Sequence, residues 1–540
     1  MPLFTVSDRP TLPAIITAAR AGSLRHAQTM FKAGGFDACV DDPSVLAVKG
    51  RLIKDEALRA PPADHATLFA LAADAYGAAC ALSPQPYTMI NQASLSLLAG
   101  RRGVAVHLAT QLLSWLATDG SIAETPYYLA ATRAEAHLLC GDVAAADRAL
   151  TEAITHDPDG WTDHASTLRQ LGLIARALGI DPAWLDCHRP PRSLNFAGHL
   201  GVGMNDAAVL RDQVSTFLTE MNIGFGYGAL AAGADIVIAE ALLAHGAELH
   251  VMLPTQVDDF VRQSVMPFAP VWLQRFEHCL AHATNVQCVT SMSGSYEPLA
   301  TKLAADVAMG ASVLNARALE SSAAQLLVID DGPGPFGTGL GTAYLGERWI
   351  NGGAQQCIRV PRSEGVVASG LKIEREGRKD LRLAAILMIS FDGLDALDEG
   401  AFAAAIGSVL EPFRAAAAAI VPQPDLTLPT GNARIAAFAD PDAAWAFARA
   451  VLALPPTALP LRLSGHYALA HWLTEPPALV GHGVTQLASI AASALPGVFT
   501  VSETLASALF VNGADEIIAE HIGEVGSIRL FAVTGRSASV

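Results

Sequence analysis

The chain has 540 residues, of which 51% are hydrophobic and 16% are charged, and its formal net charge is −17. This length predicts about three or four domains, and the composition is typical of a globular chain and not of a disordered one. The negative charge argues against a nucleic-acid partner, because the phosphate backbone would be repelled.

The sequence also argues against a membrane or secreted protein. No run approaches 18 uncharged apolar residues, and the start, Met1–Asp8, carries no basic segment followed by an apolar core. The seven cysteines are scattered and form no Cys-x-x-Cys pair, which is typical of reduced thiols and not of a metal or redox site. We therefore expect a cytoplasmic protein without a membrane partner.

Residues 1–188 are predicted to form an all-α domain, because apolar positions recur at helical spacing and β-branched runs are few. Counting from Tyr127, the small residues are Ala134, Ala146 and Ala153, and Leu150 is the large apolar residue. Gly141 lies at the expected turn, and Pro158 follows the second helix. This spacing resembles a tetratricopeptide repeat, in which small side chains let paired helices approach and proline ends the second helix. An earlier copy contains Ala72, Tyr76, Ala79 and Pro84, with its first helix interrupted near Pro61-Pro62.

The same region has a second resemblance. The segments Val45–Asp55 and Pro86–Ala93 resemble the helical TRAF-binding region of MAP kinase kinase kinases, over about residues 40–180. That resemblance implies a scaffold with a face that binds a protein partner, although helices that only pack on a neighbouring domain are an open alternative. Lys49, Arg51 and Lys54 either contact a ligand or form a solvated helix face.

Residues 190–362 are predicted to form an α/β, Rossmann-like domain with a mostly parallel sheet, because strands alternate with helices. We expect Gly224–Ala229 to be a glycine-rich turn. The strands are expected at 192–197, 247–254, 325–329 and 356–360. Helices are expected at 206–221, after Ala231–Asp235 through Leu243, and from 341. A ligand crevice is expected at the carboxyl ends of the strands.

Small or polar residues at these ends are the candidate ligand-binding residues: Gly198, His199, Gly226, Gly228, Asp235, Asp330, Gly341 and Thr342. Glycines let backbone N–H groups approach a phosphate, and a helix N-terminus favours its charge. The order of elements resembles the SLOG group, which includes Lonely Guy phosphoribohydrolases, and this resemblance implies a nucleotide or nucleotide-derived ligand. Leu345 stands where the Lonely Guy signature has Glu, which argues against hydrolysis. A structural hydrogen bond by His199, and capping or pairing by Asp235 and Glu240, are open alternatives.

Residues 380–540 resemble the catalytic domain of class III adenylate and guanylate cyclases, which implies an α+β, ferredoxin-like fold. The resemblance covers 383–533 and rests on four segments: Leu383–Leu394, Pro429–Pro441, Leu461–His466 and Val480–Ile490. Cyclases of this class usually pair, so the resemblance also implies a homodimer through this domain.

The polar residues that the family uses are replaced. Two aspartates of the family hold two divalent metals, and the alignment places Ser390 and Asn432 at these positions. An Asn and an Arg of the family hold the ribose and the transition-state phosphate, and Thr485 and Ser489 stand there. Uncharged side chains are poor metal ligands and serine supplies no guanidinium, and each such group is commonly worth about 10²–10³ in rate. Asp392, on the same strand face as residue 390, is the alternative metal ligand.

The sequence therefore predicts a catalytically degenerate, cyclase-like signalling or scaffold protein, a pseudoenzyme without an assigned cofactor or metal. The middle domain would sense a nucleotide derivative, and the helices would bind a protein partner. Three alternatives stay open: an active cyclase with atypical metal ligands, a nucleotide hydrolase in the middle domain, and a pure protein-interaction scaffold.

Overall fold

The computed structural model describes residues 10–118, 124–290, 298–330, 340–349, 353–361, 380–455, 457–511 and 517–535. The chain forms two compact units. The first, called the helical unit below, is built mainly from Met1–Pro190, and the second, the two-sheet unit, from Pro191–Arg317 and Ser321–Gly535. The linker expected at Glu374–Asp380 lies outside the described residues, apart from Asp380.

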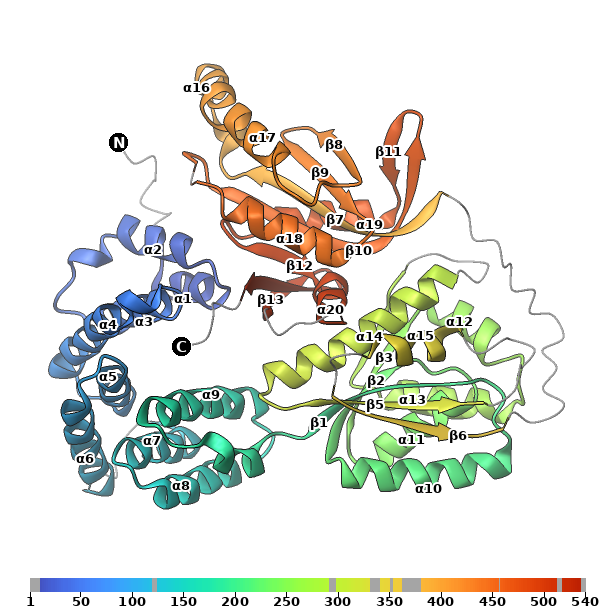
Figure 1. Cartoon of the computed structure of the whole chain (residues 1–540), viewed down its shortest axis with the longest axis horizontal. Helices are drawn as coiled ribbons and strands as arrows, with labels where there is room; N and C mark the ends of the chain where they lie inside the picture. The colour runs from blue at the N-terminus through green and yellow to red at the C-terminus, as the bar shows by residue number, and fades with distance from the viewer. Residues whose placement is uncertain are drawn as a thin grey trace. The chain divides into compact units, whose positions relative to one another are not determined.

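The helical unit is a series of helices (Figure 1, blue to teal). Its helices are α1 (Leu12–Arg20), α2 (Leu24–Ala33), α3 (Pro43–Ala57), α4 (Pro62–Leu82), α5 (Pro86–Leu98), α6 (Arg102–Thr118), α7 (Pro126–Leu139), α8 (Val143–His156) and α9 (Trp161–Leu178). Short 3-10 helices lie at Phe36–Ala38 and Pro182–His188. Consecutive helices bury small and aliphatic side chains against each other, as along α5, α6, α7, α8 and α9.

Capping residues and prolines start several of these helices. The Asp42 side chain accepts hydrogen bonds from the backbone N–H groups of Ser44 and Val45, and Pro43 occupies the first helical position. Proline suits that position because its missing N–H would be unpaired there anyway. Pro61-Pro62 acts in the same way: Pro62 begins α4. The expectation of one interrupted helix is wrong, because these prolines separate two helices.

The hairpin of α7 and α8 follows the expected spacing. Ala134, Ala146, Leu150 and Ala153 are fully buried. Gly141 lies in the turn with φ of 83°, a left-handed conformation that glycine adopts without steric cost. The small side chains therefore lie in the core of the helical unit, where they let neighbouring helices pack closely.

Within the described residues, two helical segments are long and apolar enough to span a membrane by length and composition: Pro62–Leu82 and Glu399–Ala418. The first is α4, which buries Phe69, Ala72 and Tyr76 in a helix–helix core.

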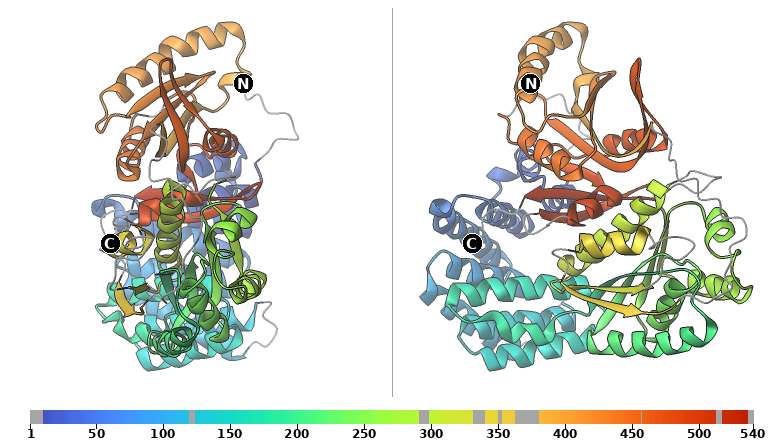
Figure 2. Two further views of the ribbon diagram at one scale, coloured as in Figure 1. Left: turned by 90° about the vertical axis from the view of Figure 1, so that its right-hand side faces the viewer. Right: turned by 45° about the vertical axis from the view of Figure 1, so that its right-hand side comes forward.

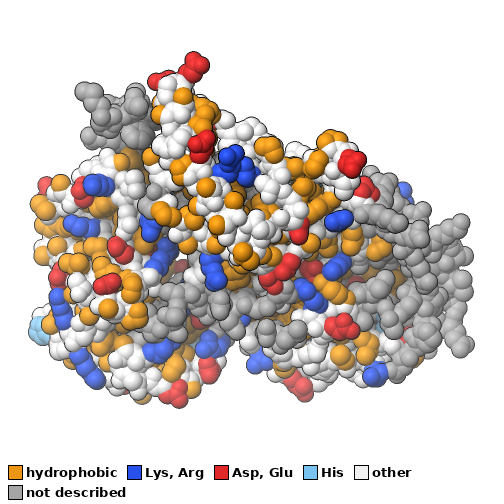
Figure 3. All heavy atoms as spheres, turned by 45° about the horizontal axis from the view of Figure 1, so that its top comes forward, with side chains coloured by type: hydrophobic (Ala, Val, Ile, Leu, Met, Phe, Trp, Pro, Cys, Tyr) orange, Lys and Arg blue, Asp and Glu red, His pale blue; other side chains and the backbone are white. Residues whose placement is uncertain are grey.

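On the face drawn in Figure 3, Lys and Arg side chains lie scattered among acidic and hydrophobic ones instead of forming one basic patch.

The first sheet of the two-sheet unit is parallel throughout. Its strands are β1 (Arg192–Gly198), β2 (Ile223–Gly228), β3 (Glu248–Leu253), β4 (Asn285–Cys288), β5 (Ala323–Ile329) and β6 (Ala354–Arg359). Their order is β4-β3-β2-β1-β5-β6, and every neighbouring pair runs parallel. The order reverses at β1, which places a topological switch point between β1 and β5.

Helices cover both faces of this sheet. They are α10 (Met204–Glu220), α11 (Ala234–Ala244), α12 (Val257–Ser264), α13 (Val271–His282), α14 (Pro298–Ala318) and α15 (Leu340–Arg348). In Figures 1 and 2, α10, α11 and α13 lie on one face, and α14 and α15 on the other. The core is continuous from Leu194 and Phe196 of β1 to the apolar residues of α11 and α13.

The glycine-rich turn predicted at Gly224–Ala229 is wrong, because this segment is β2. A Cβ on Gly226 would lie 2.3 Å from Leu242, and one on Gly228 would lie 2.5 Å from Phe196. These glycines are therefore packing positions in a buried strand, where α11 and the ring of Phe196 come too close for a side chain.

The second sheet is mixed. Its strands are β7 (Leu381–Phe391), β8 (Leu426–Thr430), β9 (Ala433–Phe438), β10 (Leu461–Thr474), β11 (Pro477–Val480), β12 (Phe499–Ser502), β13 (Ile517–Val525) and β14 (Ile528–Gly535). The order is β13-β14-β12-β10-β7-β9-β8, and β11 pairs with β10. β10 and β12 run parallel, and the other pairs run antiparallel.

The helices of this part are α16 (Glu399–Ala405), α17 (Glu411–Ala418), α18 (Pro441–Leu452), α19 (His482–Ala492) and α20 (Glu503–Val511). A π-helical turn, Ile406–Leu410, joins α16 to α17. Leu487 of α19 packs with Ala384 and Ile386 on one face of β7. Phe438, opposite Ala385 in the register, contacts Phe447 of α18 on the other face.

Candidate functional site

The carboxyl end of β1 brings together three of the predicted ligand-binding residues. The backbone N–H of Gly198 donates to Oδ1 of Asp235 at 2.7 Å, and the N–H of Ala231 donates to Oδ2 at 3.2 Å. Burial raises the pKa of Asp235 to about 7. The buried ring of His199 lies 2.9 Å from the carbonyl oxygens of Leu200 and Val360 through its two nitrogens. Asp235 and His199 therefore tie the end of β1 to its neighbours.

The remaining residues of this predicted crevice lie around the same edge. Gly228 ends β2, Asp330 follows β5 and is half-buried, and Gly341 and Thr342 lie in the first turn of α15. Thr342 is buried. Gly226 lies inside β2 and not at its end. Contact of any of these residues with a nucleotide stays a prediction, and residues 337–339 of the glycine-rich segment lie outside the described residues.

Glu240, for which the sequence leaves capping or pairing within the fold open, lies within α11 and is paired with Arg275. Nε of Arg275 donates to its Oε1 at 2.7 Å, and Nη2 donates to Oε2. Such a two-point contact is the strong form of an arginine–carboxylate pair. The geometry joins α11 to α13.

The two positions aligned with the metal aspartates of cyclases lie next to each other in the second sheet. The register pairs Ile389 with Arg434, so Ser390, at the end of β7, lies beside the β8–β9 turn that holds Asn432. The side-chain amide of Asn432 donates to Oδ1 of Asp395. The fold thus brings the two aligned positions together, with a hydroxyl and an amide where the family has carboxylates.

Asp392, the alternative metal ligand, is already paired. Nη2 of Arg462 lies 2.6 Å from its Oδ1. Arg462 is the direct cross-strand neighbour of Ser390 on β10, and such neighbours share one face of a sheet. The guanidinium of Arg462 therefore lies on the same side of the sheet as Ser390 and holds the side chain of Asp392.

The helix aligned with the ribose and phosphate contacts is α19. Thr485 and Ser489 are both exposed on it. Gln486 points inward instead, and its Oε1 lies 3.1 Å from Nε2 of His466. Burial lowers the pKa of His466 to about 4, so this ring is neutral at pH 7. α19 therefore presents hydroxyl groups at the two aligned positions and buries a neutral hydrogen-bonded pair.

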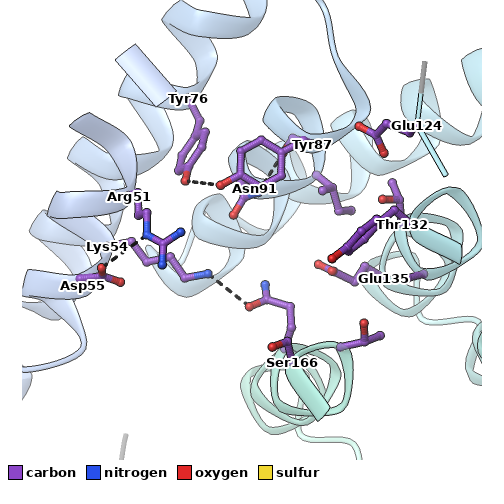
Figure 4. A pocket seen from close by; sticks show the side chains of 15 residues that line it. Arg51, Lys54, Asp55, Tyr76, Tyr87, Asn91, Glu124, Thr132, Glu135 and Ser166 are labelled. Atoms are coloured by element: carbon purple, nitrogen blue, oxygen red, sulfur yellow. Dashed lines mark hydrogen bonds and ion pairs between the residues drawn. The ribbon is translucent and has the colours of Figure 1, made fainter. Parts of the chain in front are cut away.

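The three basic residues of α3 separate into two environments. Lys49 donates to the backbone oxygen of Asp37 at 3.5 Å. Arg51 and Lys54 instead line a cavity of about 550 Å³ inside the helical unit (Figure 4). Arg51 and Lys54 therefore lie where they could contact a ligand in the cavity, which was one of the two interpretations made from the sequence.

In the part of the chain that the structure describes, Asp147, Cys187 and His188 each bring one ligand atom within 4.8 Å of the others. Nε2 of His188 lies 2.7 Å from Oδ1 of Asp147, and the exposed Cys187 donates to the oxygen of Trp184. These contacts account for the cluster as a local hydrogen-bonding group.

Sequence reasoning missed Arg462, Glu135 and Gln170. The residues around Arg462 in the sequence do not indicate a role for it. Its position beside Ser390 and Asp392 depends on the pairing of β10 with β7, about 70 residues earlier in the chain. Glu135 did carry a signal: it is a charged residue between two fully buried alanines, Ala134 and Ala136. A charge in an apolar helix face requires a partner or a polar cavity.

No protein-family model matches this chain, and no curated protein is significantly similar to it. Among solved structures, it is similar to the adenylyl cyclase CyaB from P. aeruginosa, with 12% identity over 30% of this chain and 97% of that chain and a TM-score of 0.25. The guanylate cyclase domain of RhGC from Catenaria anguillulae is 14% identical over 29% and 98%, with a TM-score of 0.24. An adenylate/guanylate cyclase/hydrolase from Silicibacter pomeroyi is 19% identical over 28% and 96%, with a TM-score of 0.22. These neighbours are class III cyclase domains, and likeness at this level carries no argument about activity.

Proposed function

We propose that this chain is a catalytically inactive, cyclase-like protein with a signalling or scaffold role. The observation that carries the proposal is the ion pair of Arg462 with Asp392, 2.6 Å long and directly across from Ser390. It occupies the carboxylate that was the alternative metal ligand, so Asp392 is not available to a metal ion beside Ser390.

The chemistry of cyclases explains why this pair matters. Divalent metals activate the ribose hydroxyl and neutralise the triphosphate, and they need charged oxygen ligands. Ser390 and Asn432 offer neutral oxygens only. Asp392, the nearest charged oxygen ligand, is held by Arg462, so the proposal assigns no metal ion to these positions.

The other parts of the chain carry the regulatory role in this proposal. The strand order of the first sheet reverses at β1, and ligands of such sheets bind outside the strand ends at that point. We therefore assign the sensing of a nucleotide derivative to the edge that holds Gly198 and Asp330. The helices would bind a protein partner, and the cyclase-like part would pair with a second copy.

The test is an assay for cyclic nucleotide with the purified full chain, ATP or GTP, and Mg²⁺ or Mn²⁺, next to an active cyclase as positive control. We expect no product above the blank from the natural chain or from Asp392→Ala. Product from the natural chain that is lost in Asp392→Ala would overturn the proposal and establish a cyclase with atypical ligands.

The sensing assignment has a separate test. We expect a nucleotide or nucleotide derivative to raise the melting temperature. We expect Thr342→Trp, a replacement of the buried Thr342 in the first turn of α15, to abolish the effect. A ligand at about 100 times its Kd adds about 2.7 kcal/mol to the free energy of unfolding. Release of free base from a nucleoside monophosphate would instead show a hydrolase in this domain.

A further inference from the structure

The cavity in the helical unit is a binding site that the proposed function does not use. It lies among α3, α4, α5, α7 and α9, and its volume of about 550 Å³ falls within the range of small-molecule pockets. All of its lining residues belong to Met1–Pro190, so the helical unit alone forms it. Figure 4 shows that side chains of opposite charge face each other across it.

One wall carries two basic side chains and the acidic side chain of Asp55. Arg51 and Lys54 are three residues apart on α3 and therefore share one face of the helix. Nε of Arg51 is buried without a hydrogen-bond partner among the described residues, and it lies 3.8 Å from Asp55. Nζ of Lys54 donates to Oε1 of Gln170 at 3.3 Å. An ammonium group has three N–H donors, so Lys54 can donate further hydrogen bonds to an anionic group in the cavity.

The opposite wall carries an acidic side chain. Glu135 projects from α7 toward the cavity (Figure 4), and Ser94 donates to its Oε2 at 3.3 Å. Part of the Glu135 surface faces the cavity, yet the surrounding protein desolvates the carboxyl group and raises its pKa to about 7. A cationic donor placed beside this carboxylate would favour its charged form.

Gln170 bridges the two walls. Its carbonyl oxygen accepts from Lys54, while a hydrogen bond from Gln170 lowers the pKa of Glu135. A direct ion pair of Lys54 with Glu135 would serve stability alone. Lys54 and Glu135 instead both contact the neutral amide of Gln170 and both face the cavity. A molecule that carries a negative and a positive group could therefore contact both side chains.

Two tyrosines form a third wall. The hydroxyl groups of Tyr76 and Tyr87 lie 3.3 Å apart, and their rings meet edge to face with centroids 5.9 Å apart. Tyr76 is buried and Tyr87 is 46% exposed. These rings offer an apolar surface with polar tips, which suits a short carbon frame between two charged ends.

We propose that this cavity binds a small zwitterion of the amino-acid class, with its carboxylate at Arg51 and Lys54 and its ammonium group at Glu135. The tyrosine pair would hold the rest of the molecule. Free amino acids and dipeptides share this chemistry, and the experiment separates them. The inference does not rest on the inactivity of the cyclase-like part.

The experiment is calorimetric titration of the purified full chain at pH 7.5 with each free L-amino acid and with a set of dipeptides. For every binder, the acid without its amino group and the amine without its carboxylate are measured as well. We expect at least one zwitterion to bind, and both one-charge analogues to bind at least 10-fold more weakly. Binding of dipeptides alone would assign the cavity to short peptides.

Variants locate the site. We expect Lys54→Met and Glu135→Gln each to weaken binding at least 10-fold. Lys49→Met, which removes a lysine of the same helix outside the cavity lining, should leave the affinity unchanged. Circular dichroism and melting curves show whether each variant is folded, and Lys54→Arg, which keeps the charge, should restore part of the affinity if Lys54→Met is unstable.

Three results would overturn the inference. The first is that no amino acid or dipeptide binds at 10 mM, roughly the upper end of a weak site's working range. The second is that binding survives in both Lys54→Met and Glu135→Gln. The third is that the acid without an amino group binds as tightly as its parent, which would make the cavity a simple anion site.

Discussion

The replacement Glu135→Gln offers a quantitative test of the cavity's electrostatics without any ligand. Burial raises the pKa of Glu135 from 4.5 to about 7 in the folded chain. A carboxyl group with a raised folded pKa contributes stability below its unfolded pKa and loses that contribution as the pH rises through its folded pKa. The natural chain should therefore lose stability between about pH 4.5 and pH 7.5 because of this one group.

The magnitude follows from the two pKa values. At about 1.4 kcal/mol for each tenfold change in proton affinity, the difference between 4.5 and about 7 corresponds to about 3 kcal/mol. This figure is an upper bound, since the side chain of Glu135 is only half-buried and solvent reduces the cost of its charge. Arg51, Asp55 and Glu124 also face the cavity and are common to both proteins. Burial lowers the pKa of Lys54 and the charge of Glu135 raises it, so the comparison reports on Lys54 together with Glu135.

The assay is denaturant unfolding of the natural chain and of Glu135→Gln at pH 5.0 and pH 8.0, followed by helical circular dichroism. The variant should gain about 2–3 kcal/mol relative to the natural chain between the two pH values. Glu152→Gln is the matched control. Glu152 is exposed beside Arg133, and the hydrogen bond from Arg133 lowers its pKa, so its difference should be small and of opposite sign.

Equal stability differences at pH 5.0 and pH 8.0 would refute the reasoning. They would mean that Glu135 is as well solvated in the folded chain as in the unfolded one. The same result would weaken the case for a cavity closely lined by protein, because the same surrounding side chains that enclose the cavity also desolvate the Glu135 carboxyl group.

Two further predictions concern the two-sheet unit. Gly228→Val should lower the free energy of unfolding by about 1–3 kcal/mol, because its Cβ would lie 2.5 Å from the ring of Phe196; thermal unfolding at constant pH measures this, and an unchanged melting temperature would contradict the packing role. Ser390→Asp with Asn432→Asp should bind Mn²⁺ weakly or not at all, and adding Arg462→Ala should tighten binding at least 10-fold, as read from the electron paramagnetic resonance signal of free Mn²⁺. Equal Mn²⁺ affinity with and without Arg462 would show that the guanidinium has no part in excluding the metal.

Local signals were strong enough to predict several elements. The uninterrupted apolar run that forms β7, the Asp440-Pro441 start of α18 and the Gly141 turn between α7 and α8 each depend on neighbouring residues alone. Capping, fixed proline geometry and positive φ act within a few residues. These features therefore appear in the sequence much as they appear in the structure.

Features that depend on distant segments escaped prediction. Three glycines in five residues predict a turn at Gly224–Gly228, but the segment is a strand because Leu242 and Phe196 fill the space of the missing side chains. The charge of Glu135 matters because Lys54 and Gln170, from two other helices, face the same cavity. No window along the chain contains these three residues together.

The ion pair of Arg462 with Asp392 also decides what a designed metal site in this sheet would require. An aspartate placed at residue 390 would lie directly across from Arg462, and the resulting salt bridge would hold the arginine in place. Replacement of Arg462 alone would leave Asp392 without this partner. A design must therefore change residues 390, 432 and 462 together, because each change made alone exchanges one paired charge for another.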